Sequence, residues 1–104
     1  MMLGENGDMS GRTIQINAQD NVVVALRPIQ KGETVEAGGK SIVAAEDIPQ
    51  GHKMAIAPIP SGGNVIKYGF PIGHTTADVS EGMWLHTHNV ATNLSGELEY
   101  VYTP

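Results

Sequence analysis

The sequence predicts a small all-β domain built from short strands and glycine corners, and three observations lead to this prediction. The 104 residues include 13 glycines and 6 prolines but a single Phe and a single Trp, which argues against long helices. Val and Ile gather in short runs, as is typical of strands. The third observation is a repeated seven-residue pattern, in which an apolar residue and a second apolar residue flank a central glycine.

This pattern occurs four times, over residues 29–35, 48–54, 59–65 and 79–85. We call its central residues the corner glycines, and they are Gly32, Gly51, Gly62 and Gly82. A glycine three residues after an apolar strand residue fits the last position of a type I turn, where only glycine adopts a positive φ at little cost. Each copy therefore predicts a tight corner between two strands. Pro49 is expected to preset φ at the second position of the second corner.

The first part of the chain is predicted from its apolar alternation. Residues 1–12 are rich in Gly, Asn, Asp and Ser and show no period, so we expect a disordered leader. Thr13–Ile16 alternates as a half-buried strand, and Val22–Leu26 is predicted to be a strand buried on both faces. Val35–Gly39 ends in a Gly-Gly turn, and Ser41–Ala45 is predicted to be the strand that leads into the second corner.

The second part follows the same logic. Met54–Ile59 is predicted to be a strand, which Pro58 confines to an edge or a short pairing. Val65–Tyr68 is the next strand, Pro71–Gly73 is predicted to turn the chain, and the fourth corner launches a strand over Met83–His88. The domain is thus expected to span residues 13–90. Residues 91–104 are expected to be a tail, either a last strand or a linker to a partner.

Composition limits the classes of function. A chain of this length forms one domain by the usual prior. Lys and Arg number 6 and are scattered, against 11 Asp and Glu, so nucleic acid and anionic membrane surfaces are poor partners. The chain has no Cys, which excludes a disulfide framework and a thiol nucleophile. Because neither a membrane span nor a signal peptide is recognisable, the expected location is cytoplasmic.

The strongest candidate for chemistry is the segment Trp84–Asn89. On a strand, His86 and His88 would project from the same face as Trp84. Two imidazoles on one face are a ligand pair that divalent metals commonly take from a strand. The alternative is a pair of exposed histidines at a strand end, and the local sequence identifies no third ligand.

Two further polar groups lie close to the corners. His52 and Lys53 follow the second corner glycine, and Lys67 and Tyr68 end the strand after the third. Lysine or tyrosine near a strand end can hold a carboxylate or move a proton at the carbon next to it. The alternative is that both groups are solvated edge residues.

A family resemblance appears when these motifs are taken together. The motifs GHK, KYG-x-x-IG and H-x-HN lie in the stretch GHKMAIAPIPSGGNVIKYGFPIGHTTADVSEGMWLHTHN. This stretch resembles the N-terminal domain of altronate and galactarate dehydratases, a domain of the SAF type with the β-clip fold. INAQDNVVVALRPIQKGETV resembles its opening strands and ATNLS its exit, so the resemblance covers about residues 13–104. It implies an SAF-like β-clip fold.

The resemblance also implies an activity, the removal of water from a sugar acid such as altronate to give a 2-keto-3-deoxy acid. It implies a divalent metal, Fe2+ or Mn2+, that stabilises the developing charge. The residues it makes candidates for metal contact are His52, His86 and His88. Those it makes candidates for catalysis are His86, His88 and Lys67. Those it makes candidates for substrate binding are Lys53, Tyr68 and Asn89.

Two departures from the family pattern bear on this reading. The large catalytic portion of the family does not follow in this sequence, so we expect it to be a separate chain, with this chain as the small subunit of a sugar-acid dehydratase. Asp47 and Asp78 each come directly before the first apolar residue of a repeat. Before the third repeat this position is occupied by Pro58, where an acidic residue is expected. The alternatives are the small subunit of a sulfolactate sulfo-lyase, which expels sulfite instead of water, and a non-catalytic carbohydrate or protein binding module. A homo-oligomer is also left open.

Overall fold

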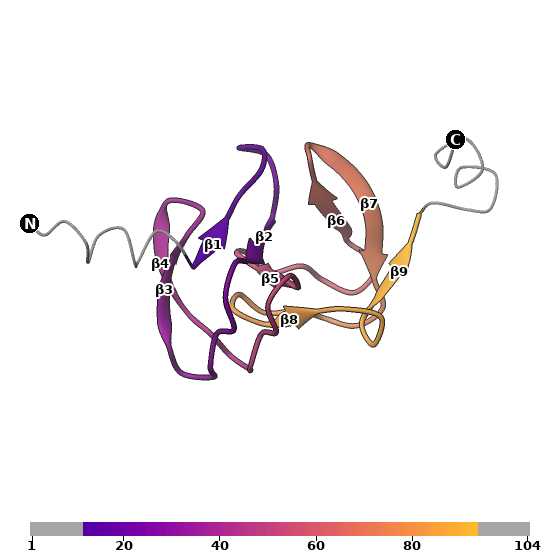
Figure 1. The fold of residues 1–104 in the computed structure, drawn as a ribbon. Coiled ribbons are helices and arrows are strands. Elements are labelled where there is room, and N and C mark those ends of the chain that lie inside the picture. The colour runs from indigo at the N-terminus through magenta and orange to yellow at the C-terminus, as the bar shows by residue number, and fades with distance from the viewer. Residues whose placement is uncertain (1–11, 94–104) are drawn as a thin grey trace, which may run out of the picture.

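The computed structural model of the chain describes residues 12–93 (Figure 1). This part of the chain contains nine short strands and no helix, which confirms the predicted all-β class. Its strands are β1 (Thr13–Ile14), β2 (Val22–Ala25), β3 (Thr34–Ala37), β4 (Lys40–Val43), β5 (Lys53–Ala55), β6 (Asn64–Lys67), β7 (Phe70–Thr75), β8 (Trp84–Leu85) and β9 (Val90–Thr92). No membrane-spanning helix is found among these residues. The expected leader up to residue 11 and the expected tail from residue 94 lie outside them.

The strands form three antiparallel groups. A four-stranded sheet in the order β1-β2-β5-β8 forms the centre. The hairpin of β3 and β4 and the three-stranded sheet β6-β7-β9 lie at opposite ends of the molecule (Figure 1). The expected domain boundary at residue 90 falls within the last of these strands. Residues 91 and 92 belong to β9, which pairs with β7.

The four corner glycines all have a positive φ, between 83° and 89°. The predicted turn frame, however, is wrong by one residue. In the first corner the amide of Glu33 donates to the carbonyl of Gln30 at 2.9 Å, so the glycine stands third in the turn. A positive φ at the third position is what a type II turn requires. In the second corner the amide of His52 donates to the carbonyl of Pro49 at 3.1 Å, so this proline stands first rather than second.

The structure reveals an internal duplication. Residues 25–54 and 55–85, which we call the first half and the second half, each contain two corners with a hairpin between them. The hairpin is β3–β4 in the first half and β6–β7 in the second. An isolated β-bridge joins the two corners of each half, Ile29 with Ile48 and Ile59 with Val79.

The duplication explains the missing acidic residue at Pro58. In each half the aspartate before the second corner caps the first corner. The amide of Lys31 donates to Asp47 Oδ1 at 2.8 Å, and the amide of Ser61 donates to Asp78 Oδ1 at 2.9 Å. The third corner is the first corner of the second half. It therefore receives a carboxylate cap and does not supply one.

A β-bulge distinguishes the second half from the first. Ile66 faces Pro71 across the β6–β7 pair, whereas Val65 faces Gly73, so Ile72 is an extra residue in β7. The turn predicted over residues 71–73 is therefore wrong, because these residues continue a strand. The β3–β4 pair keeps a regular register throughout.

Two apolar cores lie on the two faces of the central sheet. Val23 on β2 and Met54 on β5 belong to the first core, whereas Val22 and Ala55 belong to the second. Neighbouring residues of a strand point to opposite faces, so β2 is buried on both sides, as predicted.

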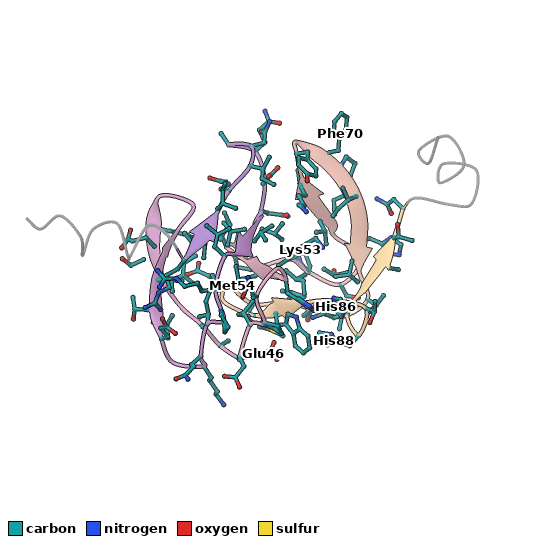
Figure 2. The ribbon with its side chains drawn as sticks, in the orientation of Figure 1. Glu46, Lys53, Met54, Phe70, His86 and His88 are labelled. Carbon is teal, nitrogen blue, oxygen red and sulfur yellow. The ribbon has the colours of Figure 1, made fainter. Side chains whose placement is uncertain are left out.

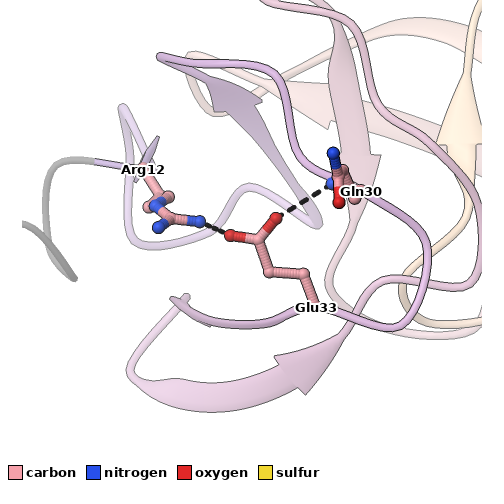
Figure 3. Close-up of polar contacts among 3 residues, drawn as sticks. All are labelled: Arg12, Gln30 and Glu33. Carbon is pink, nitrogen blue, oxygen red and sulfur yellow. Dashed lines mark hydrogen bonds and ion pairs between the residues drawn. The ribbon is translucent and has the colours of Figure 1, made fainter.

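The first corner is also tied to the start of β1 (Figure 3). The carboxylate of Glu33 forms an ion pair with Arg12 and accepts a hydrogen bond from the amide of Gln30 at 2.9 Å. The carbonyl of Arg12 accepts a hydrogen bond from the amide of Leu26 at 2.7 Å. These contacts hold β1 at the edge of the central sheet beside the first half.

Replacing Gly82 should destabilise the fold more than replacing Gly51. Both residues have a positive φ, at which an L-residue costs about 1–2 kcal/mol. A Cβ at Gly51 would meet nothing within 4 Å, whereas one at Gly82 would collide with the carbonyl oxygen of Val43. We therefore expect Gly51→Ala to lower the free energy of unfolding by about 1–2 kcal/mol and Gly82→Ala by clearly more, measured by urea denaturation. Equal losses would show that the contact with Val43 is unimportant.

Candidate functional site

A pocket of about 460 Å³ is lined by strands β5 to β9 and by the turn after β8. Its polar side chains include Lys53, Lys67, Tyr68 and His86, all of which are predicted site residues. Figure 2 shows Lys53 and His86 in the space between the central sheet and the β6–β7 hairpin. The structure thus brings together four predicted residues from three separate segments of the chain.

The walls of the pocket are mainly apolar. They are formed by Ile72, the extra residue of the bulge, by Leu85 of β8 and by Val90 of β9. Sequence reasoning missed these three residues, because their convergence depends on the strand pairing of the second half. An apolar wall with a few polar groups is the usual composition of a small-molecule site.

Comparison of the two halves shows why the pocket is open. Ile56, five residues after the second corner glycine, is buried and packs directly against Gly38 of the β3–β4 hairpin, where it fills the space under the turn. At the corresponding positions, Thr87 lies five residues after the fourth corner glycine and Tyr68 lies in the turn of the β6–β7 hairpin, and both line the pocket. The space that is filled with apolar atoms in the first half is therefore accessible in the second.

The pocket is electrostatically positive although the chain as a whole is acidic. Among residues 12–93, Lys53 and Lys67 line it, whereas no Asp or Glu does. Burial lowers the pKa of Lys53 below its ordinary value of 10.5, and the nearby positive charge of Lys67 lowers it further. An anion bound between the two ammonium groups would relieve this repulsion. The pocket is therefore suited to a carboxylate or another small anion.

His52, His86 and His88 surround Trp84, but not through the strand geometry that was predicted. Strand β8 ends at Leu85 and does not reach His88, so the prediction that both histidines project from one strand is wrong. The ring of Trp84 instead stacks with His86 at a centroid distance of 5.8 Å and contacts His88 at 4.7 Å. His52, which follows the second corner, lies 4.3 Å from His86 between ring centroids.

A buried asparagine holds this arrangement in place. The side chain of Asn89 donates to the carbonyl of Trp84 at 2.9 Å and accepts from the amide of His86 at 3.0 Å. It is 6% exposed and does not line the pocket. Its side chain has a structural role, since both polar atoms of its amide bond the turn that presents His86, and a role in substrate binding stays a prediction.

The environment of His86 favours its neutral form. Loss of water contacts to its neighbours lowers the pKa of its imidazole, and electrostatic interaction with His52, Lys53 and His88 lowers it further. The residue nevertheless remains exposed at the pocket. A neutral imidazole beside two ammonium groups can accept a proton from a bound ligand.

The predicted divalent metal does not fit the described residues. Within residues 12–93 no group of three or more His, Asp or Glu side chains is placed to hold a metal ion. His52 is moreover engaged, since its Nδ1 accepts a hydrogen bond of 3.0 Å from Trp84 Nε1. This bond places the proton of the neutral ring on Nε2, where it blocks metal binding. His86 and His88 are thus the two predicted ligands that remain.

Comparison with known proteins places the chain among relatives of one family. Residues 11–93 match the family model described as the altronate/galactarate dehydratase SAF domain. The chain is similar to altronate dehydratase of Bacillus subtilis, with 52% identity over 91 residues, and to that of Escherichia coli, with 44% identity over 91 residues. Both matches cover 88% of this chain and 18% of the relative, so the chain spans less than a fifth of the length of these relatives.

A second group of relatives is shorter. The chain is similar to (2R)-sulfolactate sulfo-lyase subunit alpha of Paracoccus pantotrophus, with 43% identity over 51 residues. That match covers 49% of this chain and 76% of the subunit. A domain of this kind therefore forms most of a protein that is named as a subunit.

Lys53→Met should stabilise the chain at pH 7. The pKa of Lys53 is lower in the folded than in the unfolded state, so its positive charge opposes folding at neutral pH, and this cost disappears as the pH rises towards 10.5. We expect an increase of up to about 1 kcal/mol in the free energy of unfolding, because the residue is partly solvated. The increase should shrink between pH 7 and pH 10, as measured by urea denaturation.

The control is the same substitution in a Lys67→Met background. Without the second ammonium group, Lys53→Met should give a smaller increase, because repulsion from Lys67 contributes to the pKa shift. Equal increases in both backgrounds would contradict an interaction between the two lysines.

Proposed function

The chain belongs to the altronate/galactarate dehydratase SAF domain family, and on this premise we propose that it serves as the small subunit, or equivalent domain, of a sugar-acid dehydratase. The proposed enzyme removes water from a sugar acid of the altronate or galactarate type. Its large catalytic portion, which the 91 matched residues do not cover, is proposed to be a partner chain. The existence of a relative named as a subunit supports this arrangement.

The observation that carries the proposal is the pocket, which the described part of the chain lines with two lysines and no carboxylate. The ammonium groups of Lys53 and Lys67 are suited to the carboxylate of a sugar acid. Two such groups also stabilise the negative charge that develops next to the carboxylate when the α-proton is removed. Partial burial, and then the nearby charge of Lys67, lower the pKa of Lys53, and a bound anion would offset both effects.

The elimination can be written with the residues of the pocket. A base removes the proton from the carbon next to the carboxylate, a carbon–carbon double bond forms, and the hydroxyl of the following carbon leaves as water after receiving a proton. The resulting enol rearranges to a 2-keto-3-deoxy acid. In this scheme His86, which favours its neutral form, is the proton acceptor, and Lys67 binds the carboxylate.

The remaining site assignments stay predictions for the assembled enzyme. His88 contacts Trp84 and lies outside the pocket lining, so a catalytic role would require the partner chain to extend the site. The same holds for the divalent metal, Fe2+ or Mn2+. Residues 12–93 do not form a site for that metal by themselves, so ligands from outside this range would be needed to hold it.

A sulfolactate sulfo-lyase is the second candidate, supported by the similarity to two sulfo-lyase subunits. A sulfonate would also fit beside two lysines, and sulfite would leave in place of water. The altronate function is preferred because the match to altronate dehydratase covers 88% of this chain. The longer of the two sulfo-lyase matches covers 49% of it. A non-catalytic binding module is the third candidate.

The proposal is tested by purifying the tagged chain with its partner from its native cells. The eluate is assayed for keto-acid formation from altronate and galactarate and for sulfite release from sulfolactate. We expect a larger chain to co-purify at constant ratio and the eluate to form keto acid. Sulfite release would select the second candidate, and recovery of an inert chain without a partner would select the binding module.

Lys53→Met should reduce kcat/KM of this assembled enzyme about tenfold or more. A hydrogen bond to a charged group contributes about 1.5–3 kcal/mol, and 1.4 kcal/mol corresponds to a factor of ten. The matched control is Lys31→Met, which removes the same charge at an exposed corner outside the pocket. Equal activity of the two variants would exclude Lys53 from substrate binding.

A further inference from the structure

We propose that Tyr68 is a specificity-determining residue whose ring packs against the carbon chain of a hydroxylated acid while the carboxylate of this ligand meets Lys67 and Lys53. The inference rests on the proposed function and deepens it, because it assigns the recognition of the carbon chain to one residue and places the ligand within this chain. It starts from the backbone of the β6–β7 hairpin.

Tyr68 adopts a backbone conformation that is unfavourable for its residue type. Its φ is 59°, and it is the one residue other than glycine with a positive φ between residues 12 and 93. L-residues rarely adopt this conformation, and bulky ones least of all. Such strain persists where other contacts impose it, and it is concentrated at functional sites.

The duplication provides a comparison within the molecule. The β3–β4 hairpin makes the corresponding turn with Gly38 at φ 60° and Gly39 at φ 82°, and the β6–β7 hairpin makes it with Tyr68 at 59° and Gly69 at 77°. The two turns have nearly the same φ values at these two positions. The fold therefore accepts glycine at this position, and the strain at Tyr68 is not required by the hairpin.

Contacts outside the hairpin hold the strained turn in place. The amide of Gly69 donates a hydrogen bond of 2.7 Å to Oδ1 of Asp20, which is 4% exposed. The second oxygen of this carboxylate accepts a hydrogen bond of 3.0 Å from the amide of Asn17. A buried aspartate from a distant part of the chain thus fixes the position from which Tyr68 projects.

The packing of the fold does not account for the tyrosine. Its side chain is 55% exposed and belongs to neither apolar core. It does line the pocket, and Nζ of Lys67 lies 4.9 Å from the centre of its ring. This cation–π contact holds the ammonium group at the pocket beside the aromatic face.

An aromatic face beside two ammonium groups defines a class of ligand. The C–H bonds of a polyhydroxylated carbon chain can pack on the ring, and the carboxylate can pair with the lysines. A neutral alditol would lose the charge interaction, whereas acetate would lose the contact with the ring. The pocket should therefore prefer a sugar acid to either of these molecules.

The test is Tyr68→Gly in the full chain, with two measurements that should change in opposite directions. The melting temperature should rise by about 4–8 °C, because glycine relieves the backbone strain. The affinity for altronate, measured by isothermal titration calorimetry, should fall about three- to tenfold. Tyr68→Phe, which keeps both the ring and the strain, is the matched control and should keep the melting temperature and most of the affinity.

Several results would overturn the inference. An unchanged or lower melting temperature of Tyr68→Gly would refute the strain, and an unchanged affinity would refute the contact with the ligand. Unchanged affinity together with weaker co-purification of the large chain would assign Tyr68 to the protein interface instead. Failure of the wild-type chain to bind altronate more tightly than acetate would also overturn the inference, while turnover by the assembled enzyme would still support the proposed function.

Discussion

A reciprocal pair of backbone hydrogen bonds, made once at every corner, is the constraint on which the rest of the structure depends. In each pair the amide of a corner glycine donates to the carbonyl of a small buried residue. The amide of that buried residue donates in turn to the carbonyl of the residue that follows the glycine. The four pairs join Gly32 to Ala44, Gly51 to Ala25, Gly62 to Thr75 and Gly82 to Ala55. With strands of two to six residues, long ladders are absent from the described part of the chain, and these bonds satisfy buried backbone groups that the strands leave unpaired.

Local sequence was sufficient for the fold class and the corners but not for their pairing. Glycine at a fixed distance from an apolar residue identifies a corner, because few other residues adopt a positive φ at low cost. The turn frame was misplaced by one residue, since Pro49 fits either the first or the second position of a turn. The caps from Asp47 and Asp78, and the bulge at Ile72, depend on which segments lie side by side. That information is not contained in any local window of the sequence.

The candidate site shows the same division. The resemblance to a family indicated Lys53, Lys67, Tyr68 and His86, and the structure places all four around one pocket. The roles of other residues followed from hydrogen bonds that link distant segments. His52 bonds Trp84 through Nδ1, and Asn89 bonds the turn beneath His86. Residue type alone could not distinguish a ligand from a support, because imidazole and amide groups serve equally well as either.

The position of β5 has a consequence for how the domain folds and for how it can be divided. Met54 faces the core of the first half and Ala55 that of the second, so one short strand completes both. Ala55 is also the residue that secures the last corner, Gly82. Each core therefore depends on a residue of β5, and a fragment produced by a cut between Met54 and Ala55 would lack part of its core. The duplicated units behave as a single cooperative body, in which loss of one half removes the support of the other.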